Sequence, residues 1–150
     1  MTISYKVFVT NILLVEDNTE QLEFLKQSLS SLGDEYYILE ASSAKEAMQA
    51  ALQHKIHLFF IDIGLPDGNG LELAKELRNV EKYALTWIVF LTTHAEYTLD
   101  AFQQTHCYDY IVKPYKADTV INLAQKLTKV ITSSMKSQEK QSIPIAKNTI

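Results

Sequence analysis

Four short apolar runs in this chain are each followed directly by a residue with a reactive side chain. The runs are NILLV at 11–15, LFFI at 58–61, WIVFL at 87–91 and YIV at 110–112, and they precede Glu16-Asp17, Asp62, Thr92 and Lys113, respectively. If the runs are parallel strands of one sheet, their carboxyl ends lie along one edge, where open α/β sheets bind ligands. Carboxylates, a hydroxyl and an ammonium would then meet in a single crevice.

The segments between these runs show the apolar spacing of helices. After a cap at Asn18-Thr19, to which Gln21 is placed to reach back, leucines recur at helical spacing until Gly33. A further strand is expected at 36–41, and further helices at 43–53, after the glycine-rich loop 64–70, at 97–104 and from 117 to about 131. Strands and helices in alternation predict an α/β fold, a doubly wound, flavodoxin-like sandwich with a five-stranded parallel sheet and five helices.

Composition narrows the class of protein. The 150 residues are 47% hydrophobic, which suits one domain with one core. The net charge of -4 argues against a nucleic-acid-binding surface on this segment. A lone cysteine, Cys107, is expected to be a small buried hydrophobe, and it favours a reducing, cytoplasmic location. We find no secretion signal and no run long and apolar enough to span a membrane.

The acidic residues at the strand ends predict a cation site. Glu16, Asp17 and Asp62 would lie close together if their strands are neighbours, and like charges about 4 Å apart repel by roughly 4 kcal/mol per pair at an effective dielectric near 20. Either one carboxylate is protonated or a cation lies among them. Carboxylate oxygens, with the backbone carbonyl of Gly64, suit Mg²⁺ as the cofactor.

Asp62 is the best candidate nucleophile, because it ends a central apolar run and precedes a loop with room for an incoming group. A carboxylate that attacks phosphorus gives an aspartyl phosphate. Lys113 would supply a compact positive charge for the phosphoryl oxygens, and the Thr92 hydroxyl a hydrogen bond. Each motif alone is commonplace, since acids often follow strands at helix starts. Their joint occurrence, in this order, favours phosphoryl chemistry.

These residues resemble the receiver domains of two-component response regulators. The match covers VED at 15–17, IDIGLPDGNG at 61–70, FLTTH at 90–94 and DYIVKPY at 109–115. The resemblance implies that Glu16 and Asp17 hold Mg²⁺ and that Asp62 accepts a phosphoryl group from a sensor histidine kinase. It also implies that Thr92 and Lys113 bind the phosphoryl oxygens, in a signalling domain rather than an enzyme.

The resemblance further implies a switch and an output surface. Tyr110 would be the aromatic residue that moves inward on activation, and a cis peptide would precede Pro114. The helix at 97–104, the last strand and the last helix would then form a homodimer face. Two positions depart from the usual pattern: Thr93 replaces a smaller residue, and Gly64 is smaller than usual, which puts access of phosphate and water in doubt.

The segments HAEYTLDAF at 94–102 and DYIVKPY at 109–115 are similar to receivers that carry a LytTR-type DNA-binding domain. We therefore expect three parts: residues 1–10 extend the first strand, residues 11–131 form the receiver domain, and residues 132–150 are a linker that leads to a C-terminal output domain. DNA would be bound only through that further domain.

Four alternatives to a phosphoryl-accepting receiver can be compared with the sequence. A haloacid-dehalogenase-type phosphatase would need a second aspartate two residues after Asp62, where this chain has Gly64. A calcium loop at 62–70 lacks acids at alternating positions. The pair His54 and His57 has no cysteine near it and is typical of a surface rather than a metal site. A pseudo-receiver, which binds partners without phosphorylation, would share the fold and stays open at this point.

Overall fold

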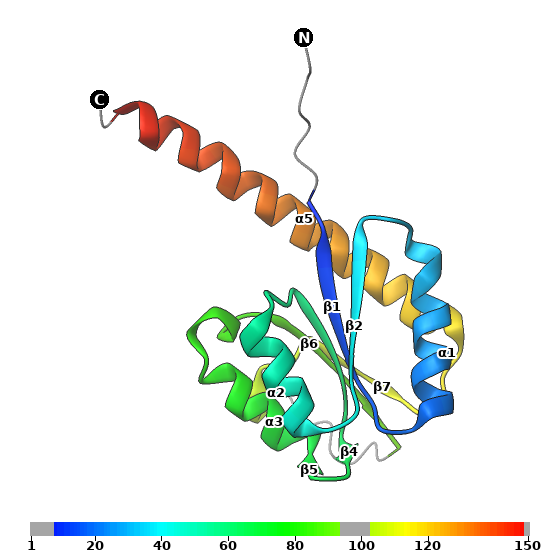
Figure 1. The fold of residues 1–150 in the computed structure, drawn as a ribbon. Helices are drawn as coiled ribbons and strands as arrows, with labels where there is room; N and C mark the ends of the chain where they lie inside the picture. Colours follow the sequence, from blue (N-terminus) through cyan, green and yellow to red (C-terminus); the bar gives the residue numbers. More distant parts are fainter. Residues whose placement is uncertain (1–7, 94–102, 149–150) are drawn as a thin grey trace.

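A five-stranded parallel sheet forms the centre of the protein, in the order β2-β1-β3-β6-β7 (Figure 1). The structure is a computed structural model and describes residues 8–93 and 103–148, with side chains described as far as residue 137. The strands are β1 (Thr10–Val15), β2 (Tyr36–Ala41), β3 (Leu58–Asp62), β6 (Trp87–Thr92) and β7 (Asp109–Val112). The predicted doubly wound α/β class is confirmed.

Helices cover both faces of the sheet. In Figure 1, α1 (Thr19–Leu29) and α5 (Ala117–Asn148) lie on one face, and α2 (Ala44–Gln53) and α3 (Gly70–Arg78) lie on the other. Short 3₁₀ turns follow α1 at Ser30–Leu32 and α3 at Glu81–Tyr83. Along β1, Ile12 and Leu14 belong to the core under α1 and α5, whereas Leu13 and Val15 belong to the core under α2 and α3. Burial on both faces explains why the strands are continuous apolar runs.

Side chains at the helix starts follow the sequence pattern with one difference. Asn18 caps α1 by accepting a hydrogen bond from the Gln21 backbone N–H at 2.9 Å, and Ser43 caps α2 in the same way from Glu46. The Gln21 side chain, however, does not reach back to the cap. It contacts Lys113 instead, because the carboxyl edge of the sheet lies beside the first turn of α1.

The expected loop at 64–70 contains a small hairpin. Strands β4 (Gly64–Leu65) and β5 (Gly68–Asn69) pair in antiparallel fashion, and α3 begins at Gly70. A Cβ atom at residue 70 would lie 2.4 Å from the carbonyl oxygen of Asp62, so the chain can pass this close to β3 only with glycine here. This approach brings the hairpin against the end of β3.

The helix expected at 97–104 lies mainly outside the described residues. The structure describes the chain again from residue 103, and residues 103–105 are helical. Cys107 is buried, as expected, before β7. Arg78 from α3 fixes this entry to β7, because its guanidinium donates to the carbonyls of Thr105 and His106 at 2.7 and 3.0 Å.

Helix α5 is longer than the sequence pattern suggested. We expected it to end near Ile131, but it continues to Asn148 and projects past the sheet (Figure 1). The polar residues at 132–142 indicate that this segment faces solvent, but they do not indicate whether it is helix or coil. No glycine or proline lies between Pro114 and Pro144 to end the helix. At the other end, β1 begins at Thr10, so Phe8 and Val9 precede the strand rather than extend it. Residues 1–7 lie outside the described part.

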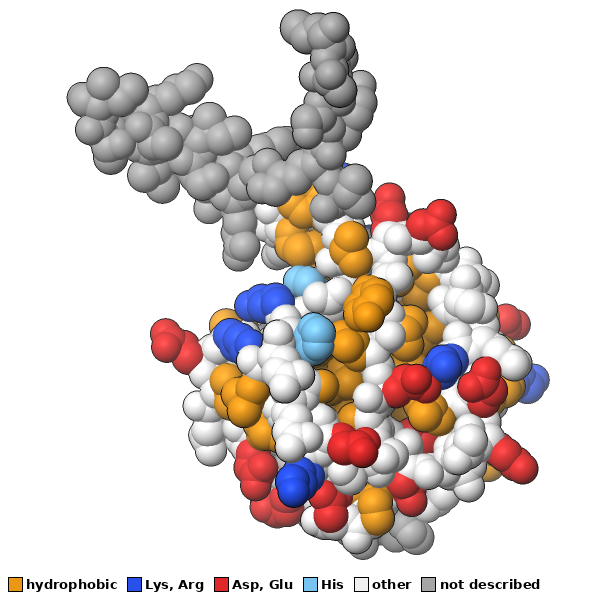
Figure 2. All heavy atoms as spheres, in the orientation of Figure 1, with side chains coloured by type: hydrophobic (Ala, Val, Ile, Leu, Met, Phe, Trp, Pro, Cys, Tyr) orange, Lys and Arg blue, Asp and Glu red, His pale blue; other side chains and the backbone are white. Residues whose placement is uncertain are grey.

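The surface carries no continuous basic stripe on the face seen in Figure 2, where Lys and Arg side chains are scattered among Asp and Glu. Within residues 8–93 and 103–148, no helix combines the length and the apolarity needed to cross a bilayer.

Candidate functional site

Three acidic side chains meet at the carboxyl edge of the sheet. Glu16 and Asp17 follow β1, and Asp62 ends β3, its neighbour in the sheet. One oxygen from each lies within 4.8 Å of the others. Glu16 and Asp62 are only 1% and 8% exposed, whereas Asp17 is exposed. The predicted convergence of these carboxylates is therefore present in the folded chain.

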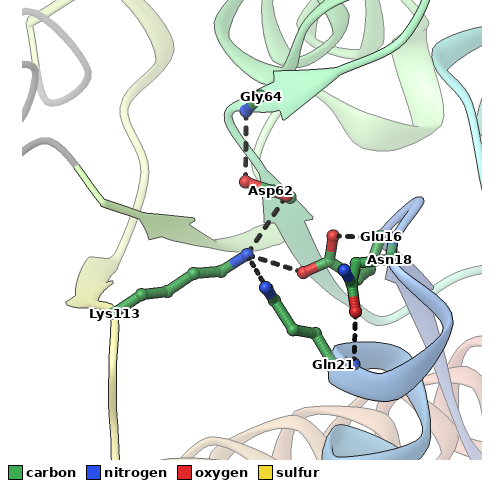
Figure 3. Close-up of polar contacts among 6 residues, drawn as sticks. All are labelled: Glu16, Asn18, Gln21, Asp62, Gly64 and Lys113. Atoms are coloured by element: carbon green, nitrogen blue, oxygen red, sulfur yellow. Dashed lines mark hydrogen bonds and ion pairs between the residues drawn. The ribbon is translucent and has the colours of Figure 1, made fainter.

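Lys113 reaches into this cluster from the end of β7 (Figure 3). Its ammonium lies 2.6 Å from Glu16 Oε1 and 3.2 Å from Asp62 Oδ2, and it also donates to the side-chain carbonyl of Gln21. The Lys113 side chain is 10% exposed, so the charges interact across little solvent. The ammonium offsets part of the repulsion between the two carboxylates.

Burial sets the charge state of Glu16. The pKa of Glu16 is raised to about 7: loss of solvation is the largest cause and the hydrogen bond with Asp62 acts in the same direction, whereas Lys113 acts to lower it. The Glu16 carboxyl group therefore changes its charge near neutral pH. A divalent cation beside it would favour the ionised form.

The two oxygens of Asp62 have different partners. Oδ1 accepts a hydrogen bond from the Gly64 backbone N–H at 3.1 Å, and Oδ2 faces the Lys113 ammonium (Figure 3). The carboxylate is therefore held by both the hairpin and β7. Such restraint from two sides fixes the orientation of the Asp62 carboxylate.

The acidic cluster lines a cavity of about 510 Å³ that is large enough for a phosphoryl group and a hydrated ion. Its lining includes Glu16, Asp17, Asp62, Gly64, Thr92 and Lys113, which are the residues predicted for metal and phosphoryl binding. Thr92 is 1% exposed and ends β6, next to β3. Thr93, one of the two unusual positions, also lines this cavity.

Carboxylate oxygens with an adjacent backbone carbonyl are the ligands that Mg²⁺ prefers, and the open cavity leaves room for water and phosphate oxygens. The donor set therefore fits this ion. Among the described residues that line the cavity there is neither a cysteine nor a histidine, so this set of ligands does not suit the softer metals.

Tyr110 lies in β7, opposite Phe90 in the parallel register and thus two residues before the level of Thr92. It is half-buried and packs against the core under α2 and α3. The peptide bond between Lys113 and Pro114 is cis, as the resemblance implied. The Nδ1 atom of His57 accepts a hydrogen bond from the Asn11 N–H at 2.9 Å. His57 thus has a structural role at the start of β1, in agreement with the expectation that it is not a metal ligand.

Two contacts between residues far apart in the sequence, one at the site and one at the tip of the adjoining hairpin, were not predicted from the sequence. Gln21 contacts Lys113 from the first turn of α1, and the only signal was its place four residues after the acidic pair. The carboxylate of Asp67 joins the hairpin to α2 by accepting hydrogen bonds from the backbone N–H groups of Ala44 and Lys45. Nothing in the local pattern indicates a partner more than 20 residues away.

A family model described as the response regulator receiver domain matches residues 12–125. The chain belongs to the response regulator receiver family. Receivers of this family are signalling domains of two-component systems, which work with histidine kinases. The strand order, the acidic cluster and the lysine at the end of β7 are consistent with this assignment.

Two similar response regulators support the narrower resemblance to LytTR-type regulators. Sensory transduction protein LytT of Enterococcus faecalis is 30% identical over 141 residues, which are 90% of this chain and 57% of that protein. Transcriptional regulatory protein LytR of Staphylococcus aureus is 27% identical over 143 residues, 89% of this chain and 57% of that protein. The chain thus spans little more than half the length of these relatives.

A solved structure shows the same fold. The response regulator TrrA from Thermotoga maritima, in complex with Mg²⁺ and BeF, is 30% identical and superposes with a TM-score of 0.69 over 79% of this chain and 99% of that one.

Proposed function

We propose that this receiver domain accepts a phosphoryl group on Asp62 in the presence of Mg²⁺ and uses the change to switch an output surface. The observation that carries the proposal is the meeting of Asp62 with Glu16, Asp17 and Lys113 in one cavity. The cognate donor would be a phosphohistidine of a sensor histidine kinase. The domain would act as a phosphoryl acceptor rather than as an enzyme with turnover.

The metal ligands would be the carboxylates of Glu16, Asp17 and Asp62 and the backbone carbonyl of Gly64. Bound Mg²⁺ would neutralise charge on the phosphoryl oxygens during transfer. Asp17 is exposed and would hold the ion from the solvent side, whereas the buried Glu16 would hold it from the side of the sheet.

In the transfer step, a carboxylate oxygen of Asp62 attacks phosphorus, and the bond between phosphorus and the donor imidazole nitrogen breaks. The bonding pair returns to the imidazole, which takes up a proton as it leaves. The products are an aspartyl phosphate and neutral histidine. Lys113, already 3.2 Å from Asp62 Oδ2, would turn to a phosphoryl oxygen, and the Thr92 hydroxyl would donate to another.

The switch would couple Thr92 to Tyr110. When the Thr92 hydroxyl turns toward the phosphoryl group, the space it leaves can accept the Tyr110 ring from the neighbouring strand. The face that includes β7 and α5 would then favour a homodimer. A cavity of about 640 Å³ already lies on this face, lined by residues of β7 and of the first turns of α5.

The biological output would be transcription. The similarity to Transcriptional regulatory protein LytR supports this output. In our proposal, residues 1–10 precede a receiver domain at 11–131, and residues 132–150 connect it to a DNA-binding domain. The continuous α5 would make that connection helical. The protein would work in the cytoplasm, without a membrane contact of its own.

Incubation of the purified chain with acetyl phosphate and Mg²⁺ tests the proposal. Intact-mass measurement should show one phosphoryl group on the wild type and none on Asp62→Asn. The nearly isosteric change should leave the fold intact, as circular dichroism would confirm. Asp34→Asn, which removes an exposed carboxylate from a turn distant in the chain, serves as the matched control and should be phosphorylated normally.

The rival is a pseudo-receiver that binds partners without phosphorylation. A folded wild-type chain that gains no phosphoryl group with either acetyl phosphate or a histidine kinase would favour it. Normal phosphorylation of Asp62→Asn would show that another residue is the acceptor.

A further inference from the structure

The tip of the β4–β5 hairpin is tied to the start of α2. Asp67 lies in the turn between the two short strands. Its Oδ1 accepts a hydrogen bond from the Ala44 N–H at 2.8 Å, and its Oδ2 accepts one from the Lys45 N–H at 3.0 Å. These N–H groups belong to the first turn of α2, where backbone donors have no partner within the helix. The same two hydrogen bonds lower the pKa of Asp67, so the carboxylate is charged at neutral pH.

The base of the hairpin is fixed separately, next to the acidic cluster. Gly64 donates to Asp62 Oδ1 at 3.1 Å, and Gly70 donates to the Ile63 carbonyl at 2.8 Å. Leu65 is buried in the core under α2 and α3. The hairpin is therefore held at its base by β3 and at its tip by α2. Gly64 is part of the base attachment, three residues before Asp67 at the tip.

The hydrogen bonds of Asp67 matter more for the position of the hairpin than for the stability of α2. Helix α2 already has its own cap, because Ser43 Oγ accepts from the Glu46 N–H at 3.1 Å, and Glu46 accepts from the N–H and hydroxyl of Ser42. Among the side-chain hydrogen bonds of the described residues, those of Asp67 are the ones that join the hairpin tip to another element.

The geometry points to Asp67 as a positioning residue of the phosphoacceptor site. By holding the hairpin against α2, Asp67 would keep the Gly64 carbonyl beside the three carboxylates and keep the Gly64 N–H on Asp62. This inference rests on the proposed function, and Asp67 itself would touch neither the ion nor the phosphoryl group. Outer residues that orient ligands commonly affect metal affinity 10- to 100-fold.

The test uses the full chain with Asp67→Ala. Titration calorimetry with Mg²⁺ alone should show binding weaker by about tenfold, the low end for residues that orient a ligand. The aspartyl phosphate formed with acetyl phosphate should also have an altered lifetime. Asp67→Asn should give an intermediate Mg²⁺ affinity, because its amide oxygen can accept only from one side.

Two controls separate positioning from stability and charge. Ser43→Ala weakens the same end of α2 without releasing the hairpin, and Glu46→Gln removes a negative charge there while its amide oxygen can still accept from Ser42. Both controls should keep wild-type Mg²⁺ affinity. In NMR spectra, the amide signals of Ala44 and Lys45 should shift on Mg²⁺ binding in the wild type and not in Asp67→Ala.

The outcomes are distinct. If the wild type binds Mg²⁺ and Asp67→Ala binds it as tightly as Ser43→Ala does, the positioning role is overturned and the proposed function stands. If Glu46→Gln weakens binding as much as Asp67→Ala, the effect is one of charge, and the positioning role is again overturned. If the wild type itself neither binds Mg²⁺ nor is phosphorylated, the proposed function fails and this inference fails with it.

Discussion

The Lys113 ammonium lies closer to Glu16 than to Asp62, at 2.6 Å against 3.2 Å. The lysine that would bind the phosphoryl group is thus paired mainly with the most deeply buried acid of the cluster. Phosphoryl transfer would require Lys113 to exchange this partner for a phosphoryl oxygen. The charge state of Glu16 therefore influences how readily the lysine is released.

The first prediction concerns pH and Glu16. Because burial raises the pKa of Glu16 from 4.5 to about 7, the folded state binds a proton more tightly than the unfolded state. The resulting stability is present in full below pH 4.5 and is lost as the pH rises through 7. We therefore expect Glu16 to lower the free energy of unfolding of the wild type by up to about 3 kcal/mol as the pH rises through this window in Mg²⁺-free buffer.

Glu16→Gln should remove that pH dependence, as urea denaturation at several pH values would measure. Glu20→Gln, which changes an exposed acid in the first turn of α1, is the control and should retain it. A pH dependence that is identical in wild type and Glu16→Gln would contradict the raised pKa.

The second prediction concerns Asp17. Asp17→Ala should weaken Mg²⁺ binding by one to two orders of magnitude, as is typical when a metal site is disturbed. The same change should raise the stability of the metal-free protein slightly, by about 0.5 kcal/mol, because one of three crowded carboxylates is removed and Asp17 is exposed. Calorimetry and thermal denaturation measure the two effects. Unchanged Mg²⁺ affinity would remove Asp17 from the site.

The third prediction compares Gly64, the first residue of the hairpin, with Gly70, the first residue of α3. Gly70→Ala places a Cβ atom 2.4 Å from the Asp62 carbonyl oxygen, so the start of α3 must move away from β3. We expect a loss of about 1–3 kcal/mol in the free energy of unfolding, the usual cost of overpacking. Gly64→Ala meets no atom within 4 Å and should leave stability within about 0.5 kcal/mol of wild type. Equal stability of the two variants would refute the close approach.

The fourth prediction separates phosphorylation from output. Thr92→Val keeps the shape of a buried side chain and removes its hydroxyl. We expect Asp62 still to be phosphorylated, more slowly, while phosphorylation no longer promotes association in sedimentation experiments. Thr10→Val is the matched control, because Thr10 is equally buried but lies at the opposite edge of the sheet. Normal phosphorylation-dependent association of Thr92→Val would exclude its hydroxyl from the switch.

Much of the fold and of the acidic cluster was predictable because both depend on local patterns. Apolar runs with a following acid identify buried parallel strands, and parallel strands bring their ends together by geometry alone. This is why the positions of Glu16, Asp62 and Lys113 at one edge could be inferred before their distances were known.

The remaining features depend on how elements dock. The contact between Gln21 and Lys113 spans 92 residues, and that between Asp67 and Ala44 spans 23, so neither leaves a periodic signal. The full length of α5 was also missed. Polar residues at 132–142 are compatible with either a solvated helix or a coil, and helix propensity alone decides weakly between them.

The strand order has a consequence for when the protein can signal. The contacts that build the site join positions as far apart as Glu16 and Lys113, which are separated by 97 residues. Such long-range pairing forms late, because the entropy of closing a long loop must be overcome first. A chain still emerging from the ribosome, or one that has lost its last strand, would lack the lysine that offsets part of the repulsion within the acidic cluster. Competence to receive a signal is thereby restricted to molecules that have completed folding.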